Sequence, residues 1–218
     1  MKTKNNTQTK STLAAVMGAF ALAVSSSHAA IVAFEAESGT LGSEFDPPLA
    51  DAGALGGFYI TTETDNGGST PGSDAFTVSY SISVAADTYD VYVRARIGDG
   101  NPNDDSFYYA KSFADADPTA SGDWHLGNGL SSTGIPVGST GPFGWGKMAG
   151  TVTSGAGGTV QWEIGAREDG FDMDAFALVT TGQVVTDAEL DAAVTIPEPS
   201  AAALLGLGGL ALILRRRK

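Results

Sequence analysis

The sequence predicts an all-β fold, a β-sandwich or jelly roll, between residues 31 and 181. Short segments rich in aromatic and β-branched residues recur there, glycine clusters separate them, and no long stretch has the periodicity of a helix. Short strands with turn residues between them are typical of sandwiches and jelly rolls. The predicted strands lie at residues 82–84, 89–95, 106–109, 159–164 and 174–179.

The N-terminal segment has the pattern of a secretory signal peptide. Basic residues at positions 2, 4 and 10 precede an apolar run at 13–24, and the small residues Ser27 and Ala29 follow. The alternative is a membrane-spanning helix, but the run is several residues too short for one. We therefore predict cleavage after Ala29 and an exported mature chain.

The C-terminal end has a second processing pattern. Pro197, Glu198 and Pro199 precede an apolar run at 201–214 and a basic cluster at 215–218, which is expected to stay on the cytoplasmic side. The pattern resembles the PEP-CTERM sorting signal of Gram-negative bacteria. The resemblance implies recognition by an exosortase-type peptidase near Pro197–Pro199 and transient insertion of an apolar sorting helix into the inner membrane. It also implies a final place at the cell surface or in the extracellular matrix; the alternative is a plain tail anchor.

Between the domain and this tail lies a predicted connector. Thr186 and Glu189 fit a capping box that opens a short helix at 190–194. The predicted divisions are thus a signal peptide at 1–29, a β-sandwich at 31–181, a connector at 182–195 and a sorting signal at 196–218.

The composition excludes several classes of function. The formal net charge is −13, and between the two processed ends the only basic residues are Arg94, Arg96, Lys111, Lys147 and Arg167. So acidic a surface repels nucleic acid phosphates, and no nucleic-acid partner is expected. The chain has no cysteine, which excludes disulfides and thiolate chemistry, so calcium is one brace that an exported domain could use instead.

Three acidic residues are candidates for such a brace. If residues 34–37 form a strand, Glu35 and Glu37 share one face, which is costly unless water or a cation neutralises them. Asp174 opens a later predicted strand on the face of Phe176 and Leu178, where it can sit at the sandwich rim. The alternative interpretation is that all three are ordinary acidic residues solvated at the surface.

Several segments together resemble carbohydrate-binding modules of families six and thirty-five, which are galactose-binding-like jelly rolls. They are residues 34–37, 89–96, 104–108 and 167–178, with Trp145 matching a tryptophan common in such modules. The resemblance implies that Glu35, Glu37 and Asp174 bind one structural Ca²⁺, which takes six to eight oxygen ligands.

The resemblance also implies a polysaccharide site of aromatic faces and polar side chains in loops. The leading candidates are Trp124, His125 and Asn128, and Tyr59 and Trp145 are weaker ones. Core packing is the alternative for each tryptophan.

The expected function is a non-catalytic, surface-sorted module that binds extracellular polysaccharide. The family commonly has an asparagine before the last strand, where this chain has Asp169 and Asp172, and this departure puts the usual sugar site in question. The alternatives are a structural or biofilm-matrix protein without a sugar site and a small glycan-active hydrolase. No nucleophile-elbow motif accompanies His125, which argues against the hydrolase.

Overall fold

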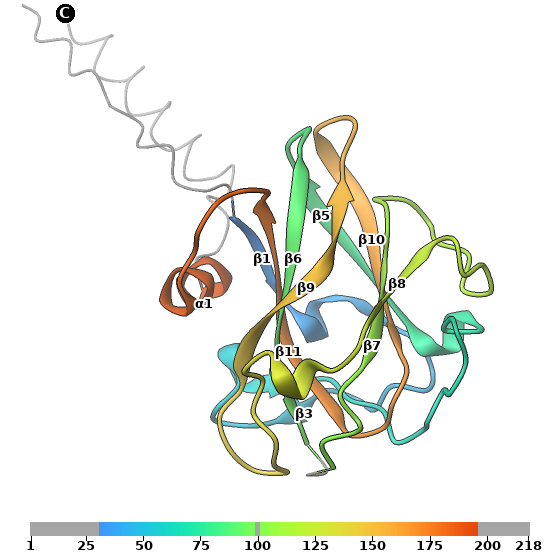
Figure 1. Ribbon diagram of the computed structural model, residues 1–218, viewed down its shortest axis with the longest axis vertical. Helices are drawn as coiled ribbons and strands as arrows, with labels where there is room; N and C mark the ends of the chain where they lie inside the picture. The colour runs from blue at the N-terminus through green and yellow to red at the C-terminus, as the bar shows by residue number, and fades with distance from the viewer. Residues whose placement is uncertain (1–30, 99–100, 196–218) are drawn as a thin grey trace, which may run out of the picture.

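The computed structural model describes residues 31–98 and 101–195; the predicted signal peptide and the sorting signal at 196–218 lie outside the described residues. Two antiparallel sheets form a sandwich (Figure 1), as predicted. One sheet has four strands in the order β1 (Ile31–Glu35), β11 (Phe171–Thr180), β6 (Thr88–Ile97) and β9 (Gly144–Thr153). The other has five, in the order β2 (Thr40–Leu41), β5 (Thr77–Val84), β10 (Gly158–Ala166), β7 (Phe107–Ala110) and β8 (Trp124–Gly127).

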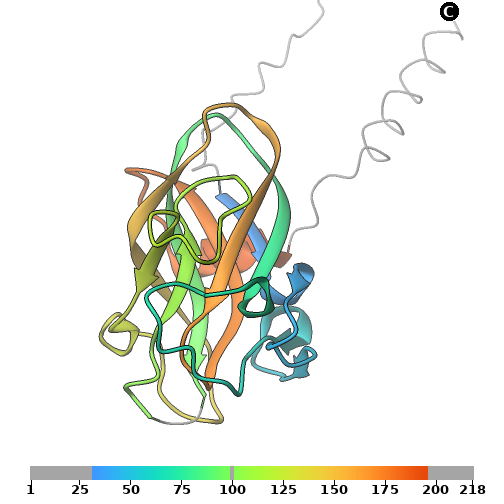
Figure 2. The same ribbon diagram turned by 90° about the vertical axis from the view of Figure 1, so that its right-hand side faces the viewer.

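Smaller elements lie between these strands. A short hairpin joins β3 (Leu49–Ala50) to β4 (Phe58–Tyr59). Four 3₁₀ turns are described, at Ala36–Ser38, Leu55–Gly57, Asp74–Phe76 and Leu130–Ser132. The single described α-helix, α1 (Asp187–Thr195), follows the last strand. Figure 2, turned by 90°, shows the strands of both sheets running along the length of the molecule.

The core between the sheets is built from aromatic side chains. Trp162 of β10 and Phe176 of β11 are fully buried, with ring centroids 5.7 Å apart in an edge-to-face arrangement. On β6, Val91, Val93 and Ala95 point inward, as the alternation of a strand requires. Burying large apolar side chains stabilises the fold by roughly 1.5–3 kcal/mol each.

The outer face of the four-stranded sheet is also covered. Ala175, Ala177 and Val179 of β11 form a second apolar cluster with Trp145 of β9 and Leu190 of α1. The capping box predicted for this helix is confirmed: Thr186 N donates to Glu189 Oε2 at 2.8 Å, and Glu189 N donates to Thr186 Oγ1 at 3.3 Å. The segment predicted as a connector therefore contains a helix that packs on the sandwich. Among the described residues, no helix combines the length and apolarity needed to cross a membrane.

Candidate ligand-binding hollow and carboxylate cluster

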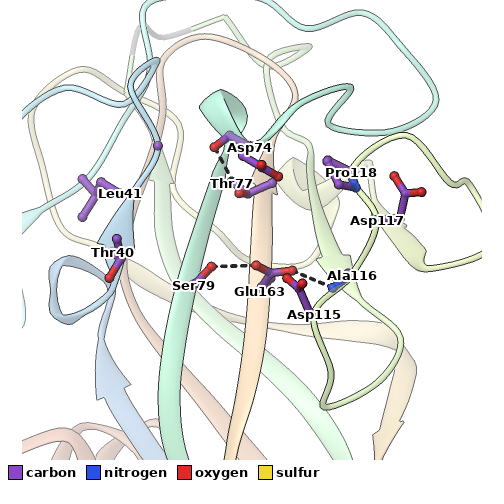
Figure 3. Close-up of a pocket in the computed structure, with 11 residues that line it drawn as sticks. Thr40, Leu41, Asp74, Thr77, Ser79, Asp115, Ala116, Asp117, Pro118 and Glu163 are labelled. Atoms are coloured by element: carbon purple, nitrogen blue, oxygen red, sulfur yellow. Dashed lines mark hydrogen bonds between the residues drawn. The ribbon is translucent and has the colours of Figure 1, made fainter.

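A hollow of about 560 Å³ opens on the outer face of the five-stranded sheet (Figure 3). Ser79 of β5 and Glu163 of β10 face it because they alternate with the core residues Tyr80 and Trp162. Its lining combines hydroxyls and carboxylates with a few apolar groups: Thr40, Leu41, Gly42, Asp74, Thr77, Ser79, Asp115, Ala116, Asp117, Pro118 and Glu163.

Glu163 forms the floor of the hollow and holds one of its walls. Its side chain is buried, and its Oε1 accepts a hydrogen bond of 2.6 Å from Ser79 Oγ. Oε2 accepts one of 2.9 Å from the backbone N–H of Ala116, in the loop between β7 and β8. The carboxylate of Glu163 therefore links β10 to β5 and also holds the loop that bounds the hollow.

Trp124 supports the same wall from inside the protein. Only 4% of its surface is exposed, and its indole Nε1 donates a 2.9 Å hydrogen bond to the carbonyl of Asp117. The expectation of an exposed tryptophan platform is therefore wrong, because Trp124 begins β8 with its ring turned into the core. The core alternative applies, and Trp124 lies beneath the loop whose other side lines the hollow.

The five predicted sugar-binding residues do not gather in one place. His125 is half-buried, with its ring 5.0 Å from that of Tyr109, and burial lowers its pKa. Asn128 is exposed beyond the end of β8. Trp145 lies under α1 on the opposite sheet, where its indole donates to Asp191 Oδ1 at 2.8 Å.

Tyr59, the fifth candidate, belongs to a cluster centred on Arg96. The guanidinium of Arg96 lies 4.9 Å from the ring centroid of Tyr59 and 4.4 Å from that of Phe143. It donates to Asp172 at 2.8 Å and to Asp51 at 2.6 Å. Asp172, one of the two departures from the family's asparagine, is therefore the buried partner of an arginine.

The three acidic residues predicted to bind a cation do come together. Glu35 ends β1, and Glu37 lies in the 3₁₀ turn Ala36–Ser38, so the expectation that both share a strand face is wrong. The turn nevertheless brings both carboxylates to Gly56, which has φ 67°. A Cβ added there would lie 2.8 Å from Glu35 Oε1 and 3.5 Å from Glu37 Oε1.

Asp174 reaches the same cluster through a β-bulge. β11 begins at Phe171, and its register with β6 shifts between Met173 and Ala175, so Asp174 neither opens the strand nor shares the inner face of Phe176. A bulge inserts one extra residue and re-aims a side chain. The carboxylate of Asp174 is fully buried; its Oδ2 pairs with Arg94 and accepts a 3.2 Å hydrogen bond from Leu55 N.

Each of the three carboxylates keeps one buried oxygen without a hydrogen-bond partner: Glu35 Oε2, Glu37 Oε2 and Asp174 Oδ1. Burial, reinforced by the charges of Glu37 and Asp174, raises the pKa of Glu35 to about 7. Burial also raises the pKa values of Glu37 and Asp174. Unsatisfied buried carboxylate oxygens are costly, and they are also the donors that Ca²⁺ prefers.

The carboxylates of Glu35, Glu37 and Asp174 are chemically suited to a divalent cation, but their oxygens do not surround one common point. Among the described residues, no group of three or more His, Cys, Asp or Glu side chains has the geometry of a finished metal site. Arg94, which occupies Asp174 Oδ2, lowers the pKa of Glu35 and partly balances the cluster. A cation would therefore use the oxygens that Arg94 and Leu55 leave free.

Comparisons with known proteins identify a motif at one end of the chain. Residues 195–218 match the PEP-CTERM protein-sorting motif, which confirms the predicted sorting signal. A search of curated proteins finds no match. The chain thus carries a sorting motif for export and placement at the cell surface.

Among solved structures, the chain resembles a GH26-CBM35 β-(1,4)-mannanase of Podospora anserina, at 20% identity and a TM-score of 0.49, over 71% of this chain and 28% of that one. It also resembles an exo-β-1,3-galactanase of Phanerochaete chrysosporium, at 16% identity and a TM-score of 0.46, over 68% of this chain and 29% of that one. The chain therefore spans less than a third of the length of either protein. The chain therefore combines a PEP-CTERM protein-sorting motif at residues 195–218 with a β-sandwich of two antiparallel sheets.

Proposed function

We propose that the mature protein is a non-catalytic module that binds extracellular polysaccharide at the hollow over β5 and β10. The observation that carries this proposal is the fixed Glu163 floor among the hydroxyls of Thr40, Thr77 and Ser79. Sugar hydroxyls need directed hydrogen-bond partners, and pockets supply them from a small number of held polar groups. Leu41 and Pro118 offer apolar contact for the C–H faces of a sugar ring.

The charge of the hollow narrows the class of glycan. Asp74, Asp115, Asp117 and Glu163 line it, and none of the described lining residues is Lys, Arg or His. Like charges placed together are unfavourable, so a uronic acid polymer would be repelled. We expect a neutral polysaccharide or one that carries free amino groups.

A calcium brace is the second part of the proposal. Glu35, Glu37 and Asp174 would hold the ion through the three oxygens that lack partners. When bound, Ca²⁺ supplies positive charge that neutralises these buried carboxylates and ties the end of β1 to the bulge of β11. It would act in stability and is given no part in a reaction.

The remaining partners concern export. We propose a signal peptide at residues 1–29, processing by an exosortase-type peptidase near Pro197–Pro199, and transient insertion of the C-terminal tail into the inner membrane of a Gram-negative bacterium. Intact mass spectrometry of the native protein should show a chain that lacks both residues 1–29 and the basic end at 215–218. A mature surface protein that still carries Arg215 to Lys218 would refute the processing.

The glycan site has its own test. Ser79→Ala and Asp115→Asn should each weaken polysaccharide binding by about tenfold, the effect of losing roughly 1.4 kcal/mol of hydrogen bonding. Isothermal titration with neutral, amino and uronic oligosaccharides measures this effect and the predicted selectivity. Asp187→Asn is a matched control, because this exposed acid lies on α1 over the other sheet. Equal affinity in all four proteins would place the site elsewhere.

One observation favours a second candidate, a structural or matrix protein that keeps the fold without a sugar site. All three tryptophans of the chain are buried, so none offers a stacking platform. No binding by the parent protein to any polysaccharide in a glycan array would favour this candidate. The structure gives less support to the hydrolase hypothesis, because both oxygens of Glu163 already accept hydrogen bonds. Release of reducing sugar from a polysaccharide would favour that hypothesis.

A further inference from the structure

The sorting motif begins where the folded domain ends. α1 ends at Thr195, and the matched motif starts at the same residue. Pro197 is two residues further along the chain, and two residues span at most about 7 Å even when fully extended. That length is less than the roughly 10 Å diameter of one α-helix. While α1 is docked, chain connectivity alone keeps the start of the sorting motif close to the sandwich.

The docking of α1 rests on a small set of contacts. Leu190 is its only buried residue and packs with Ala177 and the other residues of the outer cluster on β11. Asp191 accepts the 2.8 Å hydrogen bond from the indole of Trp145, and its Oδ1 lies 3.3 Å from Nε of Arg94. Leu190, Asp191 and the partly buried Val194 therefore hold the helix on the sheet.

The helix has little stability of its own. It is nine residues long, and isolated helices shorter than about 12 residues are marginal in water. The chain that leads to it, residues 181–184, is exposed, and Val184 is 95% exposed. Undocking would therefore break few contacts outside the helix itself, which marks α1 as an element that can open locally.

We propose that α1 is a latch that must leave the sheet before the sorting motif is processed. Docked, it holds Pro197 within two residues of the folded domain, too close for a membrane peptidase to surround the chain. Undocked, residues 182–195 become a spacer that can extend to about 45 Å. This inference rests on the proposed processing of the sorting signal and adds a step that controls it.

Two variants weaken the latch by different routes. Leu190→Ala removes the buried side chain, and Thr186→Ala removes the capping box without touching the docking face. Hydrogen exchange on the purified mature chain should show faster exchange in α1 for both, with the sandwich strands unchanged. Val184→Ala, at an exposed position, is the matched control.

The decisive measurement is the rate at which the tail is lost in the native host, followed by intact mass after a pulse of synthesis. We expect loss at least about thirtyfold faster for Leu190→Ala and about fivefold faster for Thr186→Ala, in proportion to the undocked population. Faster exchange in α1 with an unchanged rate of tail loss would overturn the latch alone. Slower loss would mean that the docked helix is part of what the peptidase recognises, which also overturns it. A parent chain that keeps its tail would overturn the processing and the latch together.

Discussion

Replacing Glu35 by Gln should change the stability of this protein in opposite directions with and without calcium. In chelator, Glu35→Gln should melt at a higher temperature than the parent, because it removes one of three crowded carboxylates with buried, unpaired oxygens. In calcium it should melt at a lower temperature than the parent, because the same change removes a charged ligand. A purely structural role for Glu35 predicts no such change of sign.

The size of the calcium response can be estimated. A ligand that binds only the folded state at a hundredfold excess over its Kd stabilises that state by about 2.7 kcal/mol. For a domain of 150–250 residues this corresponds to an increase in Tm of about 5–10 °C. Thermal unfolding of the parent, Glu35→Gln and Asp174→Asn, each in calcium and in chelator, measures it. Asp187→Asn should respond like the parent.

Asp174→Asn is preferred to alanine because its side-chain oxygen can still accept the hydrogen bonds of Leu55 and Arg94. Alanine would leave the largely buried guanidinium of Arg94 without its closest partner and would confuse the loss of a ligand with the loss of an ion pair. Identical melting of the parent in calcium and in chelator would show that the cluster binds no calcium.

The strand pattern predicted the sandwich but missed one of its longer strands. The five predicted strands lie within or overlap β5, β6, β7, β10 and β11, whereas β9 was not predicted. Its glycines look like turn residues in the sequence. In the structure they allow a loop to approach: a Cβ at Gly144 would lie 2.8 Å from Pro136, and one at Gly146 would lie 2.7 Å from Ile135. The sequence does not show that the preceding loop folds back onto the strand, so these glycines are easily taken for turn residues.

The acidic cluster was predictable, but the hollow was not. Glu35 and Glu37 are two residues apart, so a family resemblance could carry them together with Asp174. The floor of the hollow joins Ser79 to Glu163 across 84 residues, and only the register of β5 against β10 makes them neighbours. A polar residue on the outer face of a strand is ordinary in a sequence, and it becomes a site only once its partner strand is known.

The sequence also carries a signal for the docking of α1. Alternation predicts polar residues on a solvent-facing side, yet β11 carries Ala175, Ala177 and Val179 on its outer face. A strand that is apolar on both faces must be covered on both. The capping box at Thr186 then identified a helix of suitable place and length, so the two observations together indicate that the helix belongs to the folded domain.

Trp124 provides the largest expected effect of a single substitution. Trp124→Ala should destabilise the protein by about 3–5 kcal/mol, because it leaves a cavity in the core. Such a loss is a large part of the stability of a typical domain. Urea unfolding measures it, and Asn128→Ala, at an exposed position four residues along the chain, should leave the free energy of unfolding unchanged.

A second substitution separates the core role of Trp124 from its hold on the loop. Trp124→Phe keeps an aromatic ring in the core but removes the N–H that donates to the carbonyl of Asp117. Asp117 and Pro118 form one wall of the hollow, so this variant should fold at a modest cost and bind polysaccharide less tightly. Weaker binding in a stable Trp124→Phe protein would mark Trp124 as a positioning residue that acts through the loop. Unchanged binding in that protein would show that the wall holds its place without the indole, since Glu163 still anchors it through Ala116.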